Sequence, residues 1–183
     1  VSAGRVHSLA LAADGSVWSW GFGAYGQLGH GDQQNQPLPK KIEAFAGQRV
    51  VAVSAGRFHS LALTADGSVW SWGDGDYGKL GHGDRQNQLL PKKNEAFAGQ
   101  RVVAVSAGRF HSLALTADGA VWSWGNGDFG KLGHGDRQHQ LLPNKVAALA
   151  GRRVVAVSAG NHSLALTSDG AVWSWGNGAF GEL

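Results

Sequence analysis

The sequence predicts an all-β fold built from a few nearly identical units, and three observations lead to it. The segment Val-Ser-Ala-Gly or its equivalent begins at Val1, Val53, Val105 and Val157, so the chain repeats with a period of 52 residues. Within each repeat, large and small side chains alternate with a period of two, as they do on strands. Glycine supplies 29 of the 183 residues, and so high a share disfavours helices.

The second unit illustrates the elements that we predict for each repeat, in chain order. The alternation predicts strands over His59–Thr64 and Val69–Trp72, joined by a hairpin turn in which both Asp66 and Gly67 can take positive φ angles. The apolar run Arg101–Val105 is typical of a strand buried on both faces, whereas Leu90–Phe97 is the weakest strand candidate. Four strands per unit favour sheets stacked face to face around an axis, as the blades of a propeller are.

The units predict a single propeller segment of about three and a half four-stranded blades. Three units are complete and the fourth is cut short, with the boundaries 1–52, 53–104, 105–156 and 157–183. Leu183 aligns with Leu132, so the last loop and strand of the fourth unit are missing. The chain also contains no methionine. We therefore expect it to be a piece of a longer protein that supplies the remaining blades.

Composition excludes several classes of protein. The chain has no cysteine, which rules out disulfide scaffolds, thiolate metal sites and cysteine nucleophiles. No apolar run is long enough to span a membrane. The net charge is +3 and the pI about 9.5, but the basic residues are spread along the chain, so a nucleic-acid partner is permitted and not indicated.

The repeated motifs resemble one known family over the whole chain. Each unit carries Ser-Ala-Gly before a His-Ser strand, an Asp-Gly hairpin and a Val-Trp-Ser-Trp strand, and the first three units continue into a Gly-x-Leu-Gly-His-Gly-Asp loop. This combination resembles the repeat of the regulator of chromosome condensation family. The resemblance implies a seven-bladed ring in an intracellular protein, cytoplasmic or nuclear. Members of that family act as a nucleotide-exchange factor for a small nuclear GTPase, as an ultraviolet-B receptor, or as binding modules in ubiquitin ligases.

The tryptophans suggest the light-sensing role of the ultraviolet-B receptor, but the motif before the His-Ser strand argues against it. The ultraviolet-B receptor carries Gly-Trp-Arg-His-Thr where this chain has Gly-Arg-Phe-His-Ser, so Arg57, Arg109 and the equivalent Arg5 replace the sensing tryptophan. Packing between blades is the ordinary role of tryptophans on strands. We expect that role for all eight, namely Trp18, Trp20, Trp70, Trp72, Trp122, Trp124, Trp173 and Trp175.

Two further motifs suggest ligands and are interpreted as structural, so no cofactor and no metal is expected. The Gly-x-Gly-x-x-Gly motif, for example Gly73, Gly75 and Gly78, leads into no helix that could hold a pyrophosphate. Such glycines suit tight bends and close approach between blades. Each loop pair of histidine and aspartate, such as His82 and Asp84, supplies only two metal-type ligands.

A histidine opens the same strand in every unit, at His7, His59, His111 and His162. A residue repeated in this way is not a set of catalytic bases, and we expect buried histidines whose ring nitrogens bond to nearby loop backbone. The serine that follows each histidine points to the opposite face of the strand, so these neighbours form no nucleophile and base pair. No enzyme is predicted.

The candidate partner-binding residues are Arg5, Arg57 and Arg109, which follow equivalent glycines and project from one face of successive blades. Arginines on one rim can bind carboxylates or phosphates of a partner. The sequence therefore predicts a non-enzymatic scaffold that binds a protein with an acidic surface through one propeller face. A guanine-nucleotide exchange factor for a small GTPase is the alternative, and chromatin or nucleic-acid binding is a weaker one.

Overall fold

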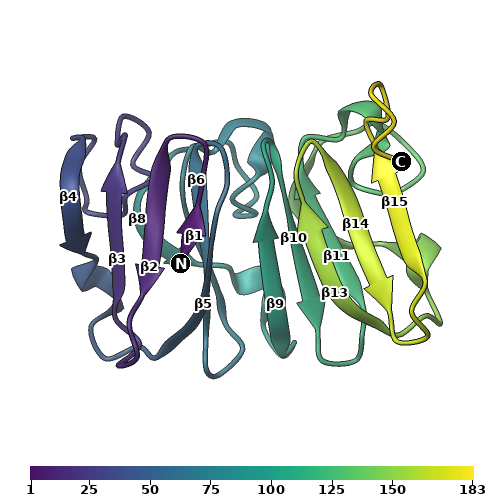
Figure 1. The fold of residues 1–183 in the computed structure, drawn as a ribbon, viewed down its shortest axis with the longest axis horizontal. Helices are drawn as coiled ribbons and strands as arrows, with labels where there is room; N and C mark the ends of the chain where they lie inside the picture. Colours follow the sequence, from purple (N-terminus) through teal and green to yellow (C-terminus); the bar gives the residue numbers. More distant parts are fainter.

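Four antiparallel sheets stand side by side in the computed structural model, which describes residues 1–183 (Figure 1). In each sheet the strands lie in chain order, so every sheet is a simple meander. Three sheets have four strands and the fourth has three. The prediction of an all-β propeller segment of about three and a half blades is therefore confirmed.

The first blade contains β1 (Ser2–Ala3), β2 (His7–Leu11), β3 (Val17–Gly21) and β4 (Gln36–Lys41). The second contains β5 (Val50–Ala55), β6 (His59–Thr64), β7 (Val69–Gly73) and β8 (Gln88–Lys93). The third contains β9 (Val102–Ala107), β10 (His111–Thr116), β11 (Val121–Gly125) and β12 (Gln140–Lys145). The fourth contains β13 (Val154–Ala159), β14 (His162–Thr167) and β15 (Val172–Gly176). Strands β5, β9 and β13 cross the repeat boundaries, so each of these blades begins a few residues ahead of its sequence unit.

Short 3-10 helices are the feature that the periodicity did not predict. They are η1 (Glu43–Phe45), η2 (Asp76–Gly78), η3 (Glu95–Phe97), η4 (Asp128–Gly130) and η5 (Ala147–Leu149). The expected strand over Leu90–Phe97 was wrong in its second half, because β8 ends at Lys93 and η3 follows. Asn94 caps that helix by accepting a hydrogen bond from the backbone of Ala96, at 3.1 Å.

The hairpin turns also differ in detail from the expectation. Gly67 has a φ of 86°, whereas Asp66 keeps a negative φ. The Asp66 carboxylate instead accepts hydrogen bonds from the Thr64 hydroxyl and the Ser68 backbone, at 2.6 and 3.1 Å. The aspartate therefore stabilises the turn through its side chain, and only the glycine supplies the left-handed conformation.

The hydrophobic core lies between the blades. In the first core cluster, Leu9, Val17 and Phe45 of the first blade pack with residues of the second, including Ala62 and Trp72. Phe45 lies edge-on to Trp72, with their ring centroids 5.6 Å apart. Burial on both faces explains why every residue of β6 and of β10 is buried.

Side chains also tie each blade to the next at equivalent positions. The hydroxyl of Ser2 accepts a hydrogen bond from the backbone of Ala55, at 3.0 Å, and the same link recurs at the two following junctions. The indole of Trp72 donates to the carbonyl of Gln27, and that of Trp124 to the carbonyl of Lys79, both at 2.8 Å.

None of the helices is long and apolar enough to cross a membrane.

Candidate partner-binding site

The inner strands β1, β5, β9 and β13 end side by side, and the residues that follow them line one hollow of about 360 Å³. Arg5, Arg57, Arg109 and Asn161 occupy equivalent places around it. The backbone amide of each arginine donates a hydrogen bond to a glycine carbonyl of the next blade, at 3.0 to 3.3 Å. The fold thus brings the three arginines together and fixes their main chain.

Two phenylalanines hold two of the arginine side chains. The guanidinium carbon of Arg57 lies 4.8 Å from the ring centre of Phe58 and 5.1 Å from that of Phe110. The guanidinium carbon of Arg109 lies 4.9 Å from the ring centre of the same Phe110, so the two arginines share this ring. Such cation–π contacts restrict an arginine while leaving its hydrogen-bond donors free. Neither phenylalanine was among the expected site residues, although the Arg-Phe pair recurs in two of the units.

The charges in the hollow act on one another. The pKa of Arg57 lies below its usual value, first because burial disfavours its cation and then because Arg109 and Arg5 repel it. The Nε atoms of Arg57 and Arg109 are buried and have no hydrogen-bond partner in the structure. Arg5 is exposed, and Val6 gives it no ring to stack on. A negatively charged ligand would relieve this repulsion.

Two buried lysines, Lys79 and Lys131, were also not foreseen from sequence. Lys79 is 1% exposed and forms a 2.7 Å ion pair with Asp74. Lys131 is 6% exposed, and its one hydrogen bond goes to the amide oxygen of Asn126, at 2.9 Å. Burial lowers the pKa of both lysines, and Asp74 offsets part of that effect at Lys79.

This difference between the blades yields a stability prediction. Asn126→Asp gives Lys131 the carboxylate that Lys79 already has, so we expect the free energy of unfolding to rise by about 1 kcal/mol. Urea denaturation at pH 7 measures it. Asn177→Asp is the matched control, because Glu182 stands in the fourth unit where the lysine is. A gain in both variants, or in neither, would contradict the ion-pair explanation.

The strand histidines bond across the blade junctions and not to loop backbone, which corrects the expectation. The Nε2 atom of His59 lies 2.9 Å from the hydroxyl of Ser112 in the next blade. The same bond joins His7 to Ser60 and His111 to Ser163, both at 2.8 Å. His162 is half-buried and has no such partner.

The hydroxyl geometry assigns the donor in the bond between each of these histidines and its serine. Ser112 donates its only proton to the carbonyl of Lys79, at 2.8 Å, so the Nε2–H of His59 must be the donor to the serine. A histidine that donates to a hydroxyl cannot remove its proton, so the pair is not a nucleophile and base. Burial lowers the pKa of His7 to about 4 and that of His111 to about 3, and it lowers the pKa of His59 well below its usual value.

The loop histidines and aspartates have separate partners. His82 bonds to Ser71 at 2.9 Å, while Asp84 accepts from the backbone of Gln86 at the same distance. Equivalent bonds occur in the first and third units, at His30, Asp32, His134 and Asp136. No group of three or more metal-type ligands occurs in the structure.

The last glycine of the Gly-x-Gly-x-x-Gly motif lies where neighbouring blades touch. A Cβ atom on Gly78 would stand 2.6 Å from the Cα of Leu141 in the third blade, and Gly78 has a φ of 77°.

The tryptophans differ in burial according to their position. Trp72 and Trp124 are fully buried between blades, and the other six are partly exposed.

Blades joined at repeated junctions, with arginines gathered at one end of the inner strands, define a repeat protein of the propeller class. The chain belongs to the RCC1-like domain family, whose model matches residues 1–183. Two curated relatives span the whole chain. The human E3 ubiquitin-protein ligase HERC2 is 45% identical, and the Arabidopsis thaliana ultraviolet-B receptor UVR8 is 42% identical. The chain spans only 4% of HERC2 and 42% of UVR8.

Solved structures show the same fold. Human WBSCR16 superposes with a TM-score of 0.88 at 29% identity, covering 98% of this chain and 47% of that one. Yeast RCC1 (Prp20), solved with Kap60, gives 0.80 at 32% identity, covering 96% of this chain and 42% of that one. The chain is therefore similar to a part of each of these proteins.

Proposed function

We propose that the chain is a non-enzymatic interaction scaffold that binds a partner protein through the hollow lined by Arg5, Arg57 and Arg109. The observation that carries the proposal is that three blades present arginines to one hollow, two of them held on phenylalanine rings. Side chains that are ordered before binding lose less conformational entropy on complex formation. An intracellular location, cytoplasmic or nuclear, is part of this proposal.

The charge of the hollow supports an acidic partner. Arginine binds carboxylates through two parallel hydrogen bonds, and no acidic residue lines the hollow. Asn161 ends the series, so the partner contacts the first three blades more than the fourth. The buried Nε atoms of Arg57 and Arg109 leave the outer nitrogens as the contact points.

Replacing Arg5, Arg57 and Arg109 together by alanine tests the proposal. We expect the affinity for a fluorescent glutamate-rich peptide to fall about tenfold at low salt and less at physiological salt, because each exposed ion pair contributes ~0.2 to 1 kcal/mol and is screened. Fluorescence anisotropy at several salt concentrations measures both effects.

The control removes the same charge from another surface. Lys41, Lys93 and Lys145 are exposed at equivalent positions of β4, β8 and β12, and their triple alanine variant should keep most of the affinity and its salt dependence. Equal losses in the two variants would show that net charge, and not the hollow, determines binding.

Nucleotide exchange on a small GTPase is the second candidate function. It rests on yeast Prp20p, which superposes with a TM-score of 0.79 at 26% identity and has been characterised for its binding to Gsp1p and histones. Faster release of labelled GDP from a small GTPase in the presence of the chain would favour it. The three complete units have 52 residues each, the fourth lacks one residue over the part present, and none carries an insertion, which favours the scaffold. Binding to chromatin or nucleic acid rests on the basic pI and is the weaker alternative.

A further inference from the structure

One residue pair in the third blade, Asn126 and Gly127, is surrounded by polar groups that do not occur together in the first or second blade. The pair follows β11, and Asn126 is only 2% exposed. The second blade has Asp74 at the position of the asparagine, and the first has Phe22. The main-chain amide of Asn126 donates to the carbonyl of Phe110, at 3.0 Å, which fixes the backbone ahead of the pair.

The main-chain nitrogen of Gly127 faces a base. Its N–H donates to Nδ1 of His139, at 3.1 Å, so that ring nitrogen carries no proton. In the first and second blades the equivalent glycine amide donates to the side-chain oxygen of Asn35 or Asn87, at 2.9 Å. An imidazole can accept a proton from a reacting group, whereas an amide oxygen is far too weak a base. The third blade therefore places a general base at the main-chain nitrogen that can close a five-membered ring with the side chain of Asn126.

The side-chain carbonyl of Asn126 receives two hydrogen bonds. The Nζ atom of Lys131 donates to Oδ1 at 2.9 Å, and the main-chain amide of Asp128 donates to the same oxygen at 3.0 Å. Donors placed in this way stabilise the negative charge that an oxygen gains when a nucleophile attacks its carbonyl carbon. The side-chain nitrogen Nδ2 donates to the carboxylate of Asp128, at 2.9 Å, which orients the amide.

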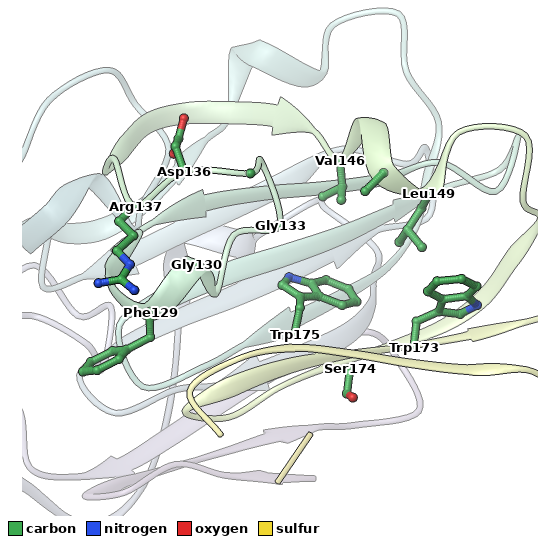
Figure 2. A pocket seen from close by; sticks show the side chains of 12 residues that line it. Phe129, Gly130, Gly133, Asp136, Arg137, Val146, Leu149, Trp173, Ser174 and Trp175 are labelled. Atoms are coloured by element: carbon green, nitrogen blue, oxygen red, sulfur yellow. The ribbon is translucent and has the colours of Figure 1, made fainter. Parts of the chain in front are cut away.

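Aromatic neighbours hold the lysine at this oxygen. The Nζ atom of Lys131 lies 5.6 Å from the ring centre of Phe129 and 5.8 Å from that of Phe110. The chain turns sharply at Phe129, which has a φ of 61°, and Figure 2 shows its ring turned away from Val146 and Leu149. Such cation–π contacts restrict the ammonium group and leave its N–H donors free for Asn126.

We propose that Asn126 is a site of self-catalysed deamidation, at which the folded chain converts its own side-chain amide into a carboxylate. The Gly127 nitrogen gives its proton to His139 and forms a bond to Cγ of Asn126, while the carbonyl electron pair moves to Oδ1. When that pair returns, the bond from Cγ to Nδ2 breaks, and the nitrogen takes the proton from His139 and leaves as ammonia. Water then opens the five-membered succinimide at Cγ, whose oxygen Lys131 still holds. Opening at Cγ restores the main chain and leaves an ordinary aspartate at position 126.

The product of this reaction has a counterpart in the second blade. Asp74 and Lys79 form an ion pair at 2.7 Å, and an aspartate at position 126 would meet Lys131 in the same way. The conversion therefore replaces a hydrogen bond to a neutral amide by an ion pair, which favours the product. The reaction does not involve the arginine hollow, so it stands independently of the proposed function.

Incubation of the purified chain at neutral pH, followed by peptide mapping with mass spectrometry, tests the proposal. The conversion replaces the side-chain nitrogen of Asn126 by oxygen, which changes the mass of its peptide. We expect ordinary aspartate as the main product in the folded chain and isoaspartate as the main product in the chain unfolded by guanidinium chloride. We also expect faster conversion in the folded chain. Asn177, which precedes Gly178 but has Glu182 in place of the lysine, is the internal control, and folding should not accelerate its conversion.

Two variants copy residues of the other blades and remove one group each. His139→Asn introduces the residue that stands at Asn87 and should slow the conversion about a hundredfold, because it removes the base. Lys131→Gln introduces the residue that stands at Gln27 and should slow the conversion about tenfold or more. Urea denaturation establishes that both variants are folded. An Asn126 that stays an amide in the folded chain, isoaspartate as the main product there, or an unchanged rate in either variant would overturn the proposal.

Discussion

Lowering the pH from 7 toward 4 is expected to unfold the chain, because three histidines are buried at the blade junctions as neutral rings. The pKa of His7 is about 4 and that of His111 about 3, against 6.5 in an unfolded chain. Between these pH values the histidines of the unfolded state bind protons and those of the folded state do not. The contribution of the neutral histidines to the free energy of unfolding is therefore fully present above pH 6.5 and is lost as the pH falls. At 1.36 kcal/mol per pKa unit, His7 alone accounts for about 3 kcal/mol.

Urea denaturation at a series of pH values between 8 and 4.5 measures this effect. His111→Gln keeps a donor near Ser163 but cannot titrate, so the slope of unfolding free energy against pH should fall by about 1.4 kcal/mol per pH unit. The half-buried His30, His82 and His134 also have lowered pKa values and act in the same direction. An unchanged slope in His111→Gln would show that this histidine is not held neutral.

Trp124→Ala should be the most damaging single substitution. The side chain is fully buried between the second and third blades, packs edge-on against Phe97 at 5.7 Å, and donates to the carbonyl of Lys79. Removing a buried tryptophan leaves a cavity and costs about 3 to 5 kcal/mol. Thermal and chemical denaturation both report the loss.

The equivalent substitution in the first blade is the control. Trp20 occupies the same place in β3 but is only partly buried in the structure. Trp20→Ala should therefore cost much less than Trp124→Ala. Similar losses in the two variants would show that packing within a sheet, and not between sheets, accounts for the effect.

The repeat and its period-two alternation were sufficient to predict the fold. Val69–Trp72 alternates clearly because Trp70 and Trp72 share one face, and β7 formed there as expected. The 3-10 helices were missed because three residues are too few to establish a helical period. Only Asn94 separates Glu95–Phe97 from the preceding strand, so nothing in the apolar pattern divides the two elements.

The candidate site was predictable only where it repeats. Arg5, Arg57 and Arg109 stand at equivalent positions, and the fold brings them to one hollow. Contacts across the junctions could not be derived from one unit. The bond from His59 to Ser112 joins residues 53 positions apart, and sequence alone does not show which blade covers which. Lys79 and Lys131 were not recognised as candidate site residues, because the first unit has Gln27 at this position and the lysine therefore does not repeat in every unit.

The uniform bonds between blades have a thermodynamic consequence. The histidine–serine bond and the serine–amide bond join only adjacent blades, and both recur at all three junctions. Stability then divides into a contribution from each blade and a contribution from each contact between neighbours, as in a one-dimensional zipper. A blade with neighbours on both sides gains two of these contacts, so the stability of the second and third blades depends on both of their neighbours.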